Sequence, residues 1–179
     1  MNDCVLDLET CGTNLDSAIV GIGVVEFDLA KGTVGRSFFR AINLGDAVNN
    51  HGAKIDPATV TWWLMQSKPA QAAIVTNCYS VRQALLDVAE FMHECSPDLK
   101  VWGNAPAFDC GMLSHLYKHL GMEVPWKFWN ERCVRTIKGL FPMVEAPAFV
   151  GEKHNAVDDC QQAIAHILKI REYVRGWKK

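Results

Sequence analysis

The 179-residue sequence predicts an α/β fold in which helices cover both faces of a mixed, five-stranded sheet. Apolar, β-branched segments near the N-terminus, separated by short turns, predict an antiparallel meander. Amphipathic helical segments then alternate with two short strand segments, as is typical of layered α/β proteins. No linker or internal repeat divides the chain, so we expect a single domain over residues 1–179.

The strands are expected where apolar residues run between turn signals. Lys31-Gly32 supplies the turn between the second and third strands. If the two later strands pair beside the first strand, that strand becomes central. The five expected strands are Cys4–Thr10, Val20–Leu29, Thr33–Ile42, Lys100–Gly103 and Arg132–Val134.

Capping residues indicate where the helices begin. Asp56 before Pro57 combines an N-cap side chain with proline at the first helical position. Ser80 with Gln83 forms a capping-box pattern, and Asn155 precedes a long apolar stripe. Three further features are a helix over Phe108–Leu120 closed by Gly121, a short helix after Thr136 and a loop over Pro142–Lys153.

Composition narrows the class of protein. A net charge of −2 argues against a protein that coats long nucleic acid by electrostatics alone. No stretch is apolar over the ~18 residues that a membrane span needs, so no membrane partner is expected. The seven cysteines lack any Cys-x-x-Cys pair, which indicates reduced thiols and a cytoplasmic location.

Asp7 and Glu9 carry the first functional signal. Side chains alternate along a strand, so both carboxylates point to one face while Leu6 and Leu8 point into the core. Two adjacent carboxylates repel each other, and Mg²⁺ prefers such oxygen ligands. From these residues alone, a solvated strand end explains the pair equally well.

Two later acids and one histidine occupy special positions. Asp109 follows a strand and opens a helix, where it could serve only as a cap. Asp159 lies at the margin of the last helix's apolar stripe, which favours a ligand role, whereas Asp158 is expected to be structural. His154 ends a loop five residues before Asp159, and an imidazole with a pKa near 6.5 suits a general base.

In order and in setting, these residues resemble the DEDDh exonucleases, which have a ribonuclease H-like fold. The matching motifs are Asp7-x-Glu9, Asn104 with Phe108-Asp109, and His154-x4-Asp159. Other segments look closer to a sub-branch that includes exodeoxyribonuclease VIII and phage T4 exonuclease A. Asn104 stands five residues before Asp109, against four in the proofreading subunits, so its role stays open.

The resemblance implies a 3′–5′ exonuclease that releases nucleoside 5′-monophosphates from single-stranded 3′ ends. Two Mg²⁺ ions, replaceable by Mn²⁺, would be held by Asp7, Glu9, Asp109 and Asp159, with His154 as the general base. The rate is expected to fall as the pH drops through the histidine pKa. By similarity, backbone at Leu8 and Thr10 would bind the terminal nucleotide, and Asn104 is a candidate contact.

Trp62 and Trp63 lie about 100° apart on a helix, so only one can fully face the core. The other is a candidate platform for stacking on a base, although both could be core residues. We also expect the Pro142–Lys153 loop to be mobile without substrate and to order over the bound 3′ end.

Two other classes of function are compatible with clustered carboxylates on this fold. A ribonuclease H-type endonuclease also uses clustered carboxylates, but the His154-x4-Asp159 pairing favours an exonuclease. A non-catalytic nucleic-acid-binding module on the same fold is disfavoured because all five active residues are present. No residue reveals a reader of the 2′-hydroxyl. The sub-branch resemblance favours DNA weakly, and RNA stays an alternative. Many relatives dimerise, so a homodimer is a candidate, but the sequence leaves the oligomeric state open.

Overall fold

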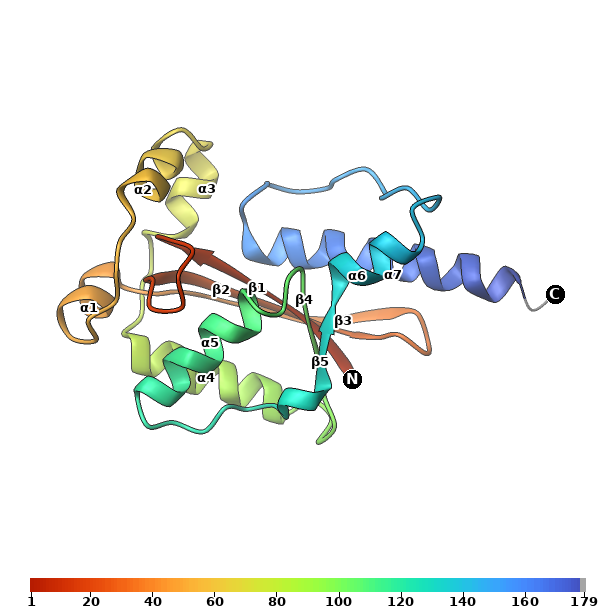
Figure 1. Cartoon of the computed structure of the whole chain (residues 1–179), viewed down its shortest axis with the longest axis horizontal. Coiled ribbons are helices and arrows are strands. Elements are labelled where there is room, and N and C mark those ends of the chain that lie inside the picture. The colour runs from red at the N-terminus through yellow and green to blue at the C-terminus, as the bar shows by residue number, and fades with distance from the viewer. Residues whose placement is uncertain (178–179) are drawn as a thin grey trace.

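A computed structural model describes residues 1–177. It contains a five-stranded mixed sheet in the order β3-β2-β1-β4-β5, which confirms the expected fold class (Figure 1). The strands are β1 (Asp3–Thr10), β2 (Ile19–Asp28), β3 (Thr33–Ala41), β4 (Lys100–Gly103) and β5 (Glu131–Cys133). β1 pairs antiparallel with β2 and parallel with β4, so it is central as expected.

Helices pack on both faces of the sheet (Figure 1). The helices are α1 (Leu44–Asn49), α2 (Pro57–Leu64), α3 (Lys68–Ala73), α4 (Val81–His93), α5 (Asp109–His119), the 3₁₀ turn η1 (Phe128–Asn130), α6 (Val134–Leu140) and α7 (Ala156–Gly176). Among residues 1–177, none of them has the length and apolar character required to cross a bilayer.

The expected caps are present. Asp56, Ser80 and Asn155 each accept a hydrogen bond from a backbone N–H of the first turn that follows. The capping box at Ser80 is only half formed, because the Gln83 amide donates to Asp87 at 2.7 Å instead of returning to Ser80. α6 begins at Val134, earlier than expected, because the Cys133 sulfur accepts the Thr136 N–H and caps it.

Two apolar layers fill the space between sheet and helices. One lies between the sheet and helices α4 and α5, and it contains Cys4, Leu6 and Leu8 of β1. The other lies under α7 and contains Val5. By strand alternation, Asp7 and Glu9 share the Val5 face, so both acids point toward α7.

Gly23 lets α7 approach this face closely. Gly23 is the cross-strand partner of Asp7 on β2. A Cβ at Gly23 would lie 2.6 Å from the Ala156 backbone and side chain, a distance that real contacts do not reach. The start of α7 therefore rests directly on the strand beside Asp7.

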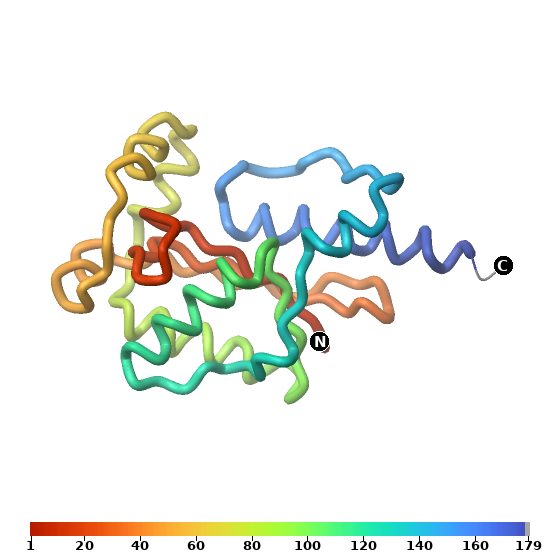
Figure 2. Tube along the Cα trace, in the orientation of Figure 1, coloured from red at the N-terminus to blue at the C-terminus, as the bar shows by residue number. Residues whose placement is uncertain are grey.

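The Pro142–Lys153 segment runs back along α7 without regular structure (Figure 2). Side chains of α7 bind three of its carbonyls: Gln162 donates to Pro147 at 2.7 Å, Lys169 donates to Glu145 at 2.9 Å, and His166 contacts Val144 at 2.7 Å. The first half of the loop is thus attached to the helix.

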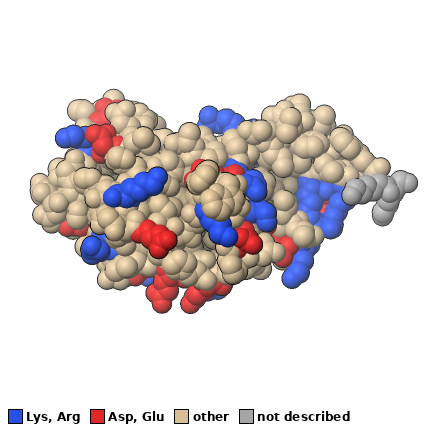
Figure 3. All heavy atoms as spheres, turned by 60° about the horizontal axis from the view of Figure 1, so that its bottom comes forward, with Lys and Arg blue, Asp and Glu red and all other residues tan. Residues whose placement is uncertain are grey.

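Charged side chains are interspersed on the face shown in Figure 3, and neither sign forms a continuous stripe there. This distribution agrees with the small net charge of −2. All seven cysteines are free thiols.

Candidate active site

Three carboxylates from two elements converge on one point. Asp7 and Glu9 come from β1, and Asp159 comes from the first turn of α7. One oxygen from each lies within 4.8 Å of the others. The close seat of α7 on Gly23 and the Asn155 cap together fix where Asp159 stands.

These acids are held where negative charge is unfavourable. Burial, followed by the charges of Asp109, Glu9 and Asp159, raises the pKa of Asp7 well above its usual range. Burial and the neighbouring acids raise the pKa of Glu9 to about 7. Burial also raises the pKa of Asp159, although the His154 backbone N–H partly opposes this shift. A bound cation would therefore stabilise the ionised form of these three carboxylates.

Asp109 lies beside this group of three and does not share its 4.8 Å cluster. Its buried carboxylate sits at the start of α5 and accepts the Ala105 N–H at 3.3 Å. Burial raises its pKa to about 6, against backbone hydrogen bonds that lower it. Among the neighbouring acids, Asp109 contributes most to raising the pKa of Asp7, so their negative charges disfavour each other.

The donor set fits divalent cations. Within the described residues, the buried Oε1 of Glu9 has no hydrogen-bond partner. A buried carboxylate oxygen without a donor is costly unless a cation binds it. Oxygen-only ligands are those that Mg²⁺ and Mn²⁺ prefer.

His154 stands next to the acids. Its backbone has φ = 63°, and its N–H donates to Oδ2 of Asp159 at 3.0 Å. Its ring meets Trp62 of α2 edge-to-face, with 4.7 Å between centroids. Nearby, the Ser67 hydroxyl donates to Glu152, and the Glu152 N–H donates to Asp158 at 2.8 Å. These contacts fix the position of His154 between Asp159 and Trp62, and they give Asp158 a role in shaping the loop.

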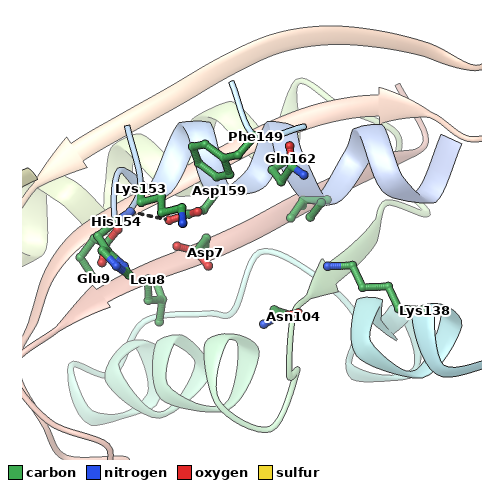
Figure 4. A pocket seen from close by; sticks show the side chains of 12 residues that line it. Asp7, Leu8, Glu9, Asn104, Lys138, Phe149, Lys153, His154, Asp159 and Gln162 are labelled. Atoms are coloured by element: carbon green, nitrogen blue, oxygen red, sulfur yellow. Dashed lines mark hydrogen bonds between the residues drawn. The ribbon is translucent and has the colours of Figure 1, made fainter. Parts of the chain in front are cut away.

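A cavity of about 410 Å³ opens in front of these residues (Figure 4). Its volume is in the range of small-molecule sites. The lining residues are Val5, Asp7, Leu8, Glu9, Asn104, Lys138, Phe149, Lys153, His154, Asp159, Gln162 and Ala163. The acids and His154 lie at one end, whereas Asn104 and Lys138 lie at the other (Figure 4).

The sequence of the chain matches the model of a known family over nearly its whole length. The model of the Rv2179c-like 3′-5′ exoribonuclease domain matches residues 2–171. The chain belongs to this family. The exodeoxyribonuclease of Enterobacteria phage T4 is 25% identical, over 98% of this chain and 92% of that protein.

Solved structures share the fold of this Rv2179c-like domain. The nuclease domain of 3′hExo, a DEDDh family member bound to rAMP, has a TM-score of 0.63 at 14% identity and covers 97% of this chain and 92% of that one. Exonuclease I of E. coli with a dT13 oligonucleotide has a TM-score of 0.64 at 13% identity, over 97% of this chain and 40% of that longer one. By this family match the chain is a 3′–5′ exonuclease, as its motifs indicated, and its fold is that of a DEDDh family member.

The two adjacent tryptophans of the Rv2179c-like domain differ in burial, as expected for neighbouring positions on a helix. Trp63 is buried, and its Nε1 donates to the Thr10 carbonyl at 2.9 Å. Trp63 is therefore a core residue, which is the alternative that the sequence left open for it. Of the two rings, Trp62 is the one that is 37% exposed and stands beside His154, so Trp62 stays the candidate for stacking on a base.

The remaining expected contacts are placed differently. Leu8 and Asn104 line the cavity. Thr10 does not line it: its hydroxyl donates to the Gly12 carbonyl at 2.7 Å, and its own carbonyl holds Trp63. The Thr10 side chain is thus occupied within the fold, and any contact with substrate falls to its backbone N–H.

Three lining residues were not foreseen: Lys138, Phe149 and Gln162. Gln162 follows Asp159 by three positions, so helical spacing could have placed it on the same face. Phe149 lies in an irregular loop, and Lys138 lies on a helix of seven residues. No sequence period marks either of them.

Proposed function

We propose that this domain hydrolyses the terminal phosphodiester at the 3′ end of a single strand, with two divalent cations and His154 as the general base. The observation that carries the proposal is the convergence of Asp7, Glu9 and Asp159 within 4.8 Å beside His154, at a cavity large enough for a nucleotide. The products would be a nucleoside 5′-monophosphate and a strand shortened by one residue.

Asp7, Glu9, Asp159 and the adjacent Asp109 would hold two Mg²⁺ ions, or Mn²⁺ in their place. Such a pair of cations lowers the pKa of a water molecule and neutralises the charge that develops on the attacking and leaving oxygens. The raised pKa of each of these acids in the metal-free chain supports this assignment.

The chain's own groups supply position and a proton acceptor. His154 would take the proton from the attacking water while the bond from that water to phosphorus forms and the bond from phosphorus to the 3′-oxygen breaks. Trp62 and the Asp159 carboxylate hold His154 in place from two directions. Backbone at Leu8 and Thr10 would meet the terminal nucleotide.

DNA is our first choice of substrate, because the phage T4 exodeoxyribonuclease is similar along nearly the whole of both chains. RNA is the second candidate, because the family model that matches is described as an exoribonuclease domain. Free thiols at all seven cysteines support a reducing compartment such as the cytoplasm.

Matched DNA and RNA oligonucleotides, labelled at the 5′ end and incubated with Mg²⁺, test the proposal directly. We expect a ladder that shortens one nucleotide at a time, faster on DNA. Asp7→Asn is the inactive control, and a circular strand of the same sequence should stay intact. Cutting of the circle, or an active Asp7→Asn variant, would refute the proposal, and a faster RNA ladder would reverse the substrate order.

A further inference from the structure

Lys138 is a half-buried lysine that lines the cavity. It comes from α6, and its ammonium group points into the cavity from the end opposite the acids (Figure 4). Within residues 1–177, no hydrogen bond or salt bridge involves this ammonium group. By contrast, Lys127 pairs with Asp98 at 2.7 Å on the exposed surface.

The surroundings of Lys138 disfavour its charge. Burial lowers its pKa, and the like charge of Arg135 lowers it further. A partly buried cation that forms no salt bridge within residues 1–177 is stabilised when an anion binds to it. The position is therefore suited to a bound anion rather than to an internal ion pair.

The neighbours of Lys138 fit one part of a nucleic acid strand. Asn104 lies near it, and Phe149 and Gln162 project from the opposite wall (Figure 4). An aromatic ring, two amides and an ammonium group can together bind a base and a phosphate. The acid cluster at the other end of the same cavity is where the linkage that is cut would lie.

We propose that this end of the cavity is a subsite for the nucleotide immediately upstream of the scissile linkage. Lys138 binds the phosphodiester next to the one that is cut, and Phe149 lies against the upstream base. This subsite rests on the proposed exonuclease function. It would make the enzyme prefer a strand over a mononucleotide ester.

Three substrates separate this role from a general one. The p-nitrophenyl ester of thymidine 5′-monophosphate has no upstream phosphate, a trinucleotide has one, and a trinucleotide with a methylphosphonate there has a neutral linkage. Lys138→Met should raise KM about 10- to 100-fold on the normal trinucleotide, which is what one charge-assisted contact contributes. The ester and the methylphosphonate strand should be cut equally by wild type and variant.

Matched variants complete the design. Lys127→Met makes the same chemical change at an exposed, paired lysine, and it should leave all three substrates unaffected. Lys138→Arg keeps the positive charge, so it should retain part of the wild-type affinity for the normal trinucleotide. Phe149→Ala should weaken binding of the normal strand but not of a strand whose upstream nucleotide is abasic. The melting temperature of Lys138→Met should match that of wild type, because the variant loses no partner.

Binding measured without turnover distinguishes the two proposals. Anisotropy of a 5′-labelled trinucleotide in Ca²⁺ should show weaker binding to Lys138→Met and not to Lys127→Met. If that difference appears but no strand is shortened in Mg²⁺, the contact between Lys138 and a strand is confirmed and the exonuclease proposal fails. If strands are shortened and Lys138→Met equals wild type on every substrate, or loses equally on the ester, the subsite is refuted.

Discussion

At the scale of single residues, the acid cluster acts against the stability of the metal-free fold. Burial and mutual repulsion disfavour the charged forms of Asp7 and Glu9. The unfolded chain exposes the same groups to water, where they ionise freely. Positive charge at the site should therefore be coupled to folding as well as to chemistry.

Glu9→Gln should stabilise the metal-free protein at pH 8. The pKa of Glu9 rises from 4.5 in the unfolded chain to about 7 in the fold, so the folded state keeps a proton that the unfolded state has released. Stability then falls as the pH rises from about 4.5 to about 7, by about 3 kcal/mol. Thermal melts in a chelator across this pH range measure the difference.

With Mn²⁺ added, wild type should become more stable than Glu9→Gln. Added Mn²⁺ should raise the melting temperature of wild type and should have little effect on Glu9→Gln. Leu86→Gln, at an exposed site away from the cavity, is the control for a new amide. A wild-type protein whose melting temperature ignores both chelator and Mn²⁺ would contradict the metal assignment.

Trp62→Ala should impair turnover while the fold survives. The variant loses the edge contact with His154 and the exposed ring beside the site. Loss of stacking on a base should raise KM about 10-fold or more, and loss of the His154 contact should lower the single-turnover rate. Trp62→Phe should recover part of the lost affinity and part of the lost rate. Trp63→Ala, by contrast, should lower the free energy of unfolding by about 3–5 kcal/mol.

A Trp62→Ala enzyme with unchanged KM and rate would remove Trp62 from the site. The sequence could not choose between the two tryptophans, because a turn of 100° leaves both near the boundary of the buried face. Strand alternation was sufficient for Asp7 and Glu9, since a period of two has only two faces. The sequence could not indicate Lys138, because the pattern of a seven-residue helix does not show which of its sides faces a cavity.

At the scale of elements, the seat of α7 on β2 depends on Gly23. Gly23→Ala would place a methyl group against Ala156 and would push the start of α7 away from Asp7. We expect a stability loss of about 1–3 kcal/mol and a larger loss of Mn²⁺ affinity, because Asp159 moves with the helix. Calorimetry of Mn²⁺ binding, set beside thermal melts, measures both.

Gly139→Ala is the matched control for Gly23→Ala, since nothing lies within 4 Å of a Cβ at Gly139. It should leave the Mn²⁺ affinity unchanged and should raise stability by no more than about 1 kcal/mol, because alanine fits the helical backbone of α6. If Gly23→Ala binds Mn²⁺ as wild type does, the position of α7 does not set the ligand geometry.

The loop before α7 should respond to ligand only in its second half. Its first half is attached to Gln162, His166 and Lys169 of α7, whereas residues 148–151 have no such attachment to that helix. Hydrogen exchange with a nucleoside monophosphate and Mn²⁺ should therefore slow over residues 148–154 and change little over 142–147. Equal exchange in both states would show that the loop does not close over the ligand.

Capping residues and apolar runs were enough to place all five strands and the longer helices. α1 and α3 were missed, because six residues carry less than two helical turns of pattern. The central position of β1 followed from the order of the strands. The contact of α7 with Gly23 could not be foreseen, because it depends on how closely two distant segments approach.

At the scale of the whole molecule, the small net charge predicts a modest dependence on salt. Each contact with a phosphate of a single strand contributes about −0.7 to the slope of log affinity against log salt. Lys138 and Lys153 are the lysines that line the cavity, so the slope should be about −1 to −2. Measurements of kcat/KM across a range of KCl test this, and Lys138→Met should flatten the slope by about 0.7.

Strand β1 is bonded to β2 along its whole length and to β4 over its first three residues, from Asp3 to Val5. Such a strand separates from its neighbours only when the sheet comes apart, whereas the segment that carries His154 can swing away by itself. Mild heating should therefore abolish exonuclease activity reversibly at a temperature below the melting temperature. Mn²⁺ should still bind at that temperature. Inactivation and unfolding would then be two events at two temperatures.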